Sequence, residues 1–144
     1  QRLRGFLSRL AESAPGIRVV AIESAMDDAA HSYRVTADMM AAHPEMDALF
    51  VVAAGAQGVC RAVLERGRER DMRVLAFDDV PENVAMMRRG LVRALVCQQP
   101  FQQGYRAVRT AFDAFLSGAI QPRENIIMEN QIKILENVEA RVGQ

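Results

Sequence analysis

The fold of this chain is decided by one short stretch, Arg73-Val74-Leu75-Ala76-Phe77-Asp78-Asp79. Four consecutive apolar residues are typical of a strand that is covered on both faces in a parallel sheet. Two carboxylates follow directly, where such a strand would end. In open parallel sheets, ligands bind beyond the carboxyl ends of the strands. The stretch therefore predicts both a buried central strand and a ligand-facing turn.

Strands and helices alternate on either side of this stretch. The apolar patterns predict strands at 17–22, 48–53, 73–77, 91–97, 123–128 and 131–135. Helices are expected near 1–14, 28–42, 58–64, 81–89 and 100–115, and Asp27 or Asp28 can cap the second of them. This alternation predicts an α/β fold of three layers, in which a mainly parallel sheet is flanked by helices.

Composition excludes several classes of function. The 144 residues carry 18 basic and 18 acidic side chains, so net charge gives no reason to expect direct contact with nucleic acid or an anionic membrane. Lys133 is the only lysine, and no P-loop is present. No apolar run is long enough to span a membrane. Cys60 and Cys97 lie in apolar runs and are expected to be buried free thiols, which favours a reducing, cytoplasmic location.

No catalytic or metal constellation can be assembled. His31 and His43 lack Cys or acidic partners at metal-binding spacing and are expected at the surface. Neither a Ser-His-Asp nor a Cys-His arrangement is evident. The sequence therefore predicts a protein that is not an enzyme and has no metal or cofactor.

The predicted strand ends place four short segments at one edge of the sheet, namely 23–26, 53–57, 78–81 and 98–100. Their amides and carboxylates suit a ligand rich in hydroxyl groups. A hydroxyl group can donate a hydrogen bond to a carboxylate, and it can both donate to and accept from an amide. Asp78 and Gln98 are the expected ligand contacts. Asp79 could instead cap the following helix, and Gln98 could be a hinge or helix-cap amide.

Four motifs in order resemble one family. Arg2-Leu3-Arg4-Gly5-Phe6 resembles the Arg-x-x-Gly-Phe motif that opens the C-terminal lobe of type I periplasmic-binding-protein-like domains. The family includes ribose-binding proteins and the effector domains of LacI-type repressors. The other three motifs are His43 to Phe50, Val74 to Asp79 and Val96 to Gly104. The resemblance implies one lobe of that fold.

By resemblance, Arg2, Asp78 and Gln98 would form hydrogen bonds to the ligand. One departure stands out, because Ala53-Ala54 occupies a place where many members have Asn-Asp. Gln57 or backbone amides of the glycine-rich segment around it could substitute. The departure bears on the identity of the ligand more than on the fold.

The resemblance also implies a division of the chain. Gln1 begins within a predicted helix, so we expect a fragment of a longer protein. Residues 1–98 would form the C-terminal lobe of an effector-binding domain, and 99–120 a crossover helix that belongs to a missing N-terminal lobe. Residues 121–136 would return as strands, and 137–144 would be a tail. The helix at 100–115 would then need another cover, such as a second chain.

These features favour the ligand-sensing part of a LacI-type transcriptional regulator. Such a protein would bind a small sugar-like effector between two lobes and transmit hinge closure, as a homodimer in the cytoplasm. It would contact DNA only through a segment that precedes this sequence. The alternative is a periplasmic sugar-binding protein of an ABC transporter.

Overall fold

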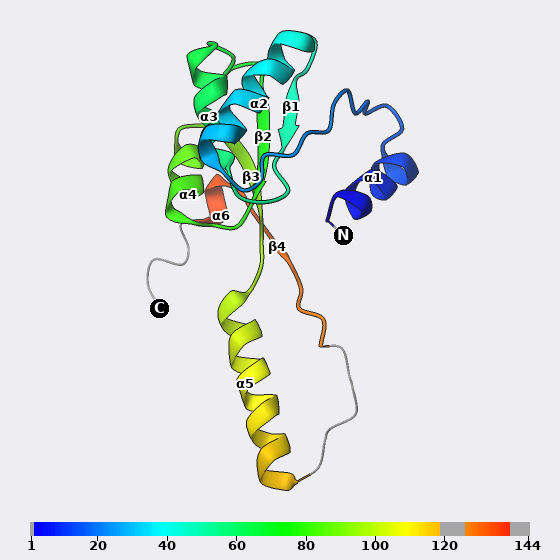
Figure 1. Ribbon diagram of the computed structural model, residues 1–144, viewed down its shortest axis with the longest axis vertical. Helices are drawn as coiled ribbons and strands as arrows, with labels where there is room; N and C mark the ends of the chain where they lie inside the picture. Colours follow the sequence, from blue (N-terminus) through cyan, green and yellow to red (C-terminus); the bar gives the residue numbers. More distant parts are fainter. Residues whose placement is uncertain (1, 119–125, 139–144) are drawn as a thin grey trace.

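The computed structural model describes residues 2–118 and 126–138 (Figure 1). Its elements run in the order α1 (Arg2–Ser13), α2 (Ala29–Ala42), β1 (Ala48–Phe50), α3 (Ala56–Glu65), β2 (Arg73–Phe77), α4 (Pro81–Arg88), β3 (Val92–Cys97), α5 (Pro100–Ser117), β4 (Gln131–Lys133) and α6 (Leu135–Val138). Helices α1 to α5 follow the expected ranges closely, whereas α6 lies where a strand end and a tail were expected. Asp28 is the N-cap of α2, and its carboxylate accepts a hydrogen bond from the His31 N–H.

The described strands form one sheet in the order β1-β2-β3-β4. β1, β2 and β3 are parallel, and β4 pairs antiparallel with β3. The prediction of an α/β fold with a mainly parallel sheet flanked by helices is therefore confirmed.

The core lies between the sheet and the helices α2, α3 and α4, which are grouped on one side in Figure 1. The strand residues that point to this side are fully buried, among them Val74, Ala76 and Leu95. Cys60 and Cys97 belong to the same core and are free thiols, as predicted. Close packing of this kind excludes water and stabilises the sheet that positions the site.

The opposite face of the sheet meets α1. The Phe6 ring lies 4.5 Å from the Phe50 ring, and Phe50 lies 5.8 Å from Phe77, measured between centroids. Phe50 and Phe77 alternate along their strands with the buried core residues, which places them on the α1 side. This face is the less covered of the two, since Ile132 of β4 is 60% exposed.

Two glycines allow α2 and α3 to approach closely. A Cβ at Gly58 would lie 1.9 Å from the Ala29 carbonyl oxygen, which is far inside van der Waals contact. Gly55, at the N-cap of α3, has a φ of 99° and abuts the Ser32 hydroxyl. The glycine-rich segment that sequence analysis linked to the ligand therefore also serves helix packing.

The structure corrects several predicted strands. Residues 17–22 form no strand, and Ile17 and Ile22 are more than half exposed, because no described strand pairs with them. β1 ends at Phe50, three residues before the expected end. The strand expected at 123–128 lies partly outside the described residues, and its described part, 126–128, is not a strand. β4 ends at Lys133, since the Asn137 side chain accepts a hydrogen bond from the Ile134 N–H and the short helix α6 follows.

Helix α5 extends away from the sheet (Figure 1). It buries none of its residues among the described part of the chain. Its exposed large side chains recur at helical spacing, and they are Phe101, Tyr105, Val108, Phe112, Phe115 and Leu116. The position of α5 agrees with the expectation that the sheet and its flanking helices do not cover the apolar face of this helix. Its assignment to another lobe, like the other domain divisions, stays a prediction.

Candidate ligand-binding site

The site is built around the end of β2 and the turn after it, residues 77–79, which we call the Asp78 turn. Asp78 has a left-handed backbone with φ of 64°, a conformation that Asp tolerates better than most residues. Asn83, on the buried side of α4, donates hydrogen bonds to the Phe77 and Asp78 carbonyl oxygens over 2.9 and 3.0 Å. The Asp78 N–H donates to Val96 O of β3. These three bonds hold the turn in its unusual conformation.

Asp78 and Gln98 meet across the ends of β2 and β3. Gln98 Nε2 lies 3.1 Å from Asp78 Oδ1 and donates a hydrogen bond to it. Both side chains are half-buried, so each keeps polar atoms within reach of solvent or a ligand. The pair combines a carboxylate, which only accepts, with an amide, which also donates.

Arg2 reaches this edge from the start of α1. Its Nη1 donates to Val52 O over 2.9 Å, and its guanidinium carbon lies 4.3 Å from the Phe77 ring centroid. An Arg over an aromatic face gains a cation–π attraction that also orients its remaining N–H donors. Arg2 is therefore placed at the site by a hydrogen bond and by a ring contact.

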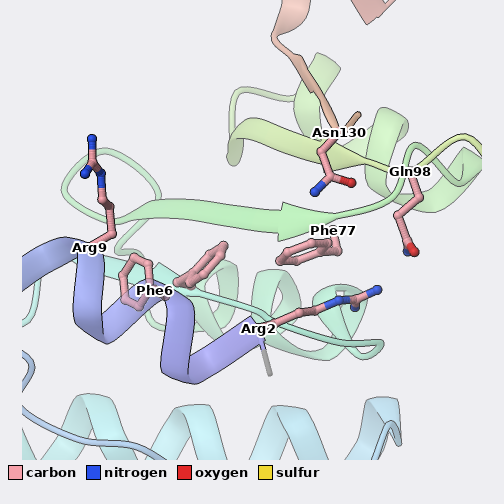
Figure 2. Close-up of a pocket in the computed structure, with 7 residues that line it drawn as sticks. Arg2, Phe6, Arg9, Phe77, Gln98 and Asn130 are labelled. Atoms are coloured by element: carbon pink, nitrogen blue, oxygen red, sulfur yellow. The ribbon is translucent and has the colours of Figure 1, made fainter. Parts of the chain in front are cut away.

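Two hollows adjoin these residues. The larger, of about 440 Å³, is lined by residues from α1, the ends of three strands and the chain before β4, namely Arg2, Phe6, Arg9, Phe50, Phe77, Gln98 and Asn130 (Figure 2). The smaller, of about 290 Å³, is lined by Asp78, Asp79, Val80, Gln98 and Pro100. Gln98 borders both. The larger hollow has an aromatic floor with polar groups at its rim, a composition common in small-molecule sites.

The structure brings three of the four predicted site residues together. Arg2, Asp78 and Gln98 border the two adjoining hollows. Gln57 is exposed in the first turn of α3 and lines neither hollow. The ligand-binding roles of all four residues stay predictions.

Ala53 and Ala54 are exposed beyond the end of β1. The Ala54 N–H donates to Asp27 Oδ1 over 3.1 Å. A backbone donor of this segment is thus engaged within the protein. Neither alanine lines either hollow, so this segment supplies no side-chain amide or carboxylate to them.

Sequence reasoning missed the aromatic floor and Asn83. Phe6, Phe50 and Phe77 belong to separate elements, and alternation within one strand does not show that their rings meet. No sequence pattern marks Asn83, because its partners are two backbone carbonyl groups whose positions depend on the left-handed turn at Asp78. The N-cap of α4 is Val80, one residue after Asp79, and the structure pairs the Asp79 carboxylate with Lys133.

Among the described residues, no cluster of three or more His, Cys, Asp or Glu could hold a metal ion. Within the same ranges, no helix combines the length and the apolar character that crossing a bilayer requires. Burial raises the pKa of the Cys97 thiol to about 11, and the nearby Asp79 adds to the shift. The raised pKa keeps this thiol neutral at pH 7, beside the Asp79 carboxylate.

Comparison with known proteins agrees with this architecture. The model of the family described as "periplasmic binding protein domain" matches residues 1–119. The chain belongs to this family.

Two curated relatives come from Escherichia coli strain K12. The chain is 31% identical to the ribose import binding protein RbsB over 118 residues, which are 81% of this chain and 39% of the relative. It is 28% identical to the D-allose-binding periplasmic protein over 112 residues, which are 77% of this chain and 36% of the relative. The chain thus spans well under half the length of these relatives.

Solved structures show the same fold. The glucose-galactose binding protein GanP of Geobacillus stearothermophilus superposes with a TM-score of 0.86 at 25% identity, over 95% of this chain and 48% of that one. A carbohydrate transporter solute binding protein of Agrobacterium radiobacter, solved with D-arabinose, gives 0.83 at 26% identity, over 94% and 45%.

These relatives bear on the two functional hypotheses from the sequence. They are named for binding or importing sugars, and none of them is named as a regulator or as an enzyme. The comparisons therefore favour the alternative, a sugar-binding transport protein, over the LacI-type regulator.

Proposed function

We propose that this chain forms one lobe of a sugar-binding protein that delivers its ligand to an ABC importer. The observation that carries the proposal is the convergence of Arg2, Asp78 and Gln98 on one edge of a parallel sheet. The sugar-binding and import functions of the relatives support it.

The chemistry of the site suits a monosaccharide. Vicinal hydroxyl groups can donate to the Asp78 carboxylate and accept from the Arg2 guanidinium, and charged partners strengthen such bonds. The amide of Gln98 can do both. The Phe77 and Phe50 rings offer an apolar surface for the C–H face of the sugar ring.

The proposed mechanism is hinge closure around the sugar. The chain leaves the sheet after Gln98 and returns to it at β4. A second lobe in the full-length protein would cover the apolar face of α5 and close over the hollows. Closure would exclude water from Asp78 and Gln98, which strengthens their hydrogen bonds to the ligand.

Isothermal titration of the full-length protein tests the proposal. We expect saturable binding of at least one of D-ribose, D-allose, D-glucose, D-galactose and D-arabinose, with no turnover of the sugar. Inorganic phosphate serves as the control ligand and should give no heat. An absence of binding to all five sugars would remove the basis of the proposal.

The LacI-type regulator remains the competing hypothesis. The buried free thiols of Cys60 and Cys97 favour it, because they suit the reducing cytoplasm. That hypothesis carries its own predictions of a homodimer, a cytoplasmic location and DNA contact through a preceding segment. Cell fractionation distinguishes the two, since an importer subunit would be found outside the cytoplasm.

A further inference from the structure

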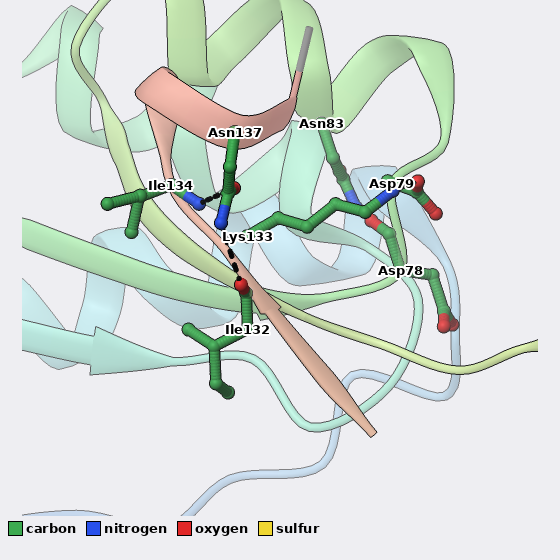
Figure 3. Close-up of polar contacts among 7 residues, drawn as sticks. All are labelled: Asp78, Asp79, Asn83, Ile132, Lys133, Ile134 and Asn137. Carbon is green, nitrogen blue, oxygen red and sulfur yellow. Dashed lines mark hydrogen bonds and ion pairs between the residues drawn. The ribbon is translucent and has the colours of Figure 1, made fainter. Parts of the chain in front are cut away.

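Lys133 occupies an unusual place for a lysine. It lies on β4, opposite Leu95 of β3, and its side chain is only 6% exposed. A buried ammonium group is costly unless a charged partner accepts its hydrogen bonds. The partner is Asp79, whose Oδ2 accepts a hydrogen bond from Lys133 Nζ (Figure 3).

The backbone on both sides of Lys133 is fixed. Asn137 accepts a hydrogen bond from the Ile134 N–H over 2.8 Å, and its amide donates to Ile132 O over 3.2 Å (Figure 3). β4 also pairs with β3 at Gln131, Ile132 and Lys133. The ammonium therefore projects from a backbone that is held on both sides.

The partner of Lys133 belongs to the Asp78 turn. Asp79 directly follows Asp78, whose carboxylate meets Gln98. Asn83 donates hydrogen bonds to two backbone carbonyl groups of the turn. Neither bond involves the side-chain carboxylate of Asp78 or of Asp79. The Lys133–Asp79 ion pair thus adds a restraint on a carboxylate of the turn, which the bonds from Asn83 do not reach.

We infer that Lys133 is a positioning residue for the ligand site. Through Asp79 it sets the orientation of the Asp78 turn, and it ties that turn to the chain segment that returns to the sheet after α5. The inference rests on the proposed sugar-binding function. Lys133 itself lines neither hollow, so its effect on the ligand is indirect.

Four variants of the full-length protein test this role, with D-ribose as the probe. Lys133→Met should weaken ribose binding about tenfold or more, because the turn loses its orientation. Lys133→Arg keeps the charge and should restore most of the affinity. Arg73→Met is the matched control, since it removes the exposed Arg73–Asp47 ion pair at the other end of the sheet and should leave ribose binding unchanged.

The double variant Asp79→Leu, Lys133→Met separates positioning from folding. Replacing both charges by apolar groups should restore the urea midpoint, because no buried charge is left unpaired. If Lys133 acts by positioning, this variant folds yet still binds ribose weakly. Wild-type affinity in the double variant would overturn the inference, and so would wild-type affinity in a folded Lys133→Met.

A readout without ligand keeps this test independent of the proposed function. The Gln98 side-chain amide resonances report its hydrogen bond to Asp78. They should shift in the folded double variant and stay in place in Arg73→Met. If wild-type protein binds no ribose but these resonances shift, the choice of sugar fails and the positioning role stands. Unshifted resonances in the folded double variant would refute the positioning role.

Discussion

Gln98 Nε2 donates a hydrogen bond to Asp78 Oδ1 over 3.1 Å, and so joins the carboxyl ends of two neighbouring parallel strands. The amide keeps its carbonyl oxygen for a ligand, and the carboxylate keeps lone pairs on both oxygens. The bond therefore orients both groups without exhausting either of them.

Asp78→Asn isolates the charge of this pair. Asn tolerates the left-handed backbone, so the turn should remain intact. Loss of a charged acceptor should weaken sugar binding by about 1–2 kcal/mol, since hydrogen bonds to charged groups are the stronger ones. Titration calorimetry measures the affinity, and exposed Asp47→Asn is the control. Equal affinities for wild type and Asp78→Asn would argue against a carboxylate contact.

Asn83→Ala removes the side chain that donates to Phe77 O and Asp78 O. Asn83 is 7% exposed, so two carbonyl groups near the core would lose their partner. We expect a loss of about 1–3 kcal/mol in the free energy of unfolding. Urea denaturation followed by circular dichroism measures it, with exposed Glu69→Ala as the control. A change below the error of the fit would mean that the Asp78 turn does not depend on Asn83.

Two glycine substitutions should have opposite effects. Gly58→Ala places a methyl group 1.9 Å from Ala29 O and should destabilise the protein by several kcal/mol, because backbone must move. In the 144-residue chain, Gly104→Ala meets nothing within 4 Å among the described residues and should stabilise helix α5 by about 0.5–1 kcal/mol. Thermal unfolding compares the two. If Gly58→Ala unfolds at the same temperature as wild type, the α2–α3 contact is looser than the structure indicates.

The two thiols should react slowly in the folded protein. Burial raises the pKa of Cys60 and of Cys97 from 9.0 to about 11. Two pKa units reduce the thiolate at pH 8 about hundredfold, and burial blocks access further. Labelling with a disulfide reagent, with and without urea, checks this expectation. Comparable rates in both conditions would contradict it.

The same shift makes a prediction about stability. Because both pKa values are raised on folding, the thiols stabilise the folded state below pH 9, and this contribution is lost as the pH rises toward 11. The free energy of unfolding should therefore fall less steeply over this range in Cys60→Ala than in wild type. Identical slopes would show that the thiol does not titrate as expected.

Tyr33 offers a spectroscopic test of the helix surface. Its hydroxyl donates to Glu65 Oε2, and this bond raises the pKa of Tyr33 above 10.0. Glu65→Gln should lower that pKa, because the negative charge beside the phenol is removed. Absorbance titration at alkaline pH measures it in the 144-residue chain with Tyr105→Phe, which leaves Tyr33 as the one tyrosine of these residues. An unchanged midpoint would indicate that the bond does not form in solution.

The residue pattern predicted the helices and the central strands because both depend on local periodicity. β2 was expected at 73–77 and is found there. The run 17–22 shows the limit of this reasoning, since a strand also needs a neighbour with which to pair. β4 illustrates a second limit. It ends at Lys133 because the Asn137 side chain accepts a hydrogen bond from the Ile134 N–H, and this bond depends on the turn into α6.

The sequence predicted those site residues that the sheet topology brings to one edge. It did not predict the side-chain pairs that form between distant parts of the chain. The rule on strand ends, together with the family motif, selected Arg2, Asp78 and Gln98, which the structure brings to one edge. The Lys133–Asp79 pair joins residues 54 positions apart, and no local pattern marks such a contact. The aromatic floor also required knowledge of which strands are adjacent.

The left-handed backbone at Asp78 limits how this position can vary. Only glycine, asparagine and aspartate adopt that conformation readily, so most other replacements would strain the turn before they met a ligand. Attempts to retune ligand preference by random mutagenesis should therefore recover few useful changes at Asp78. The accepted changes should accumulate around it, at positions such as Gln98 and Asn130 whose backbones impose no such restriction.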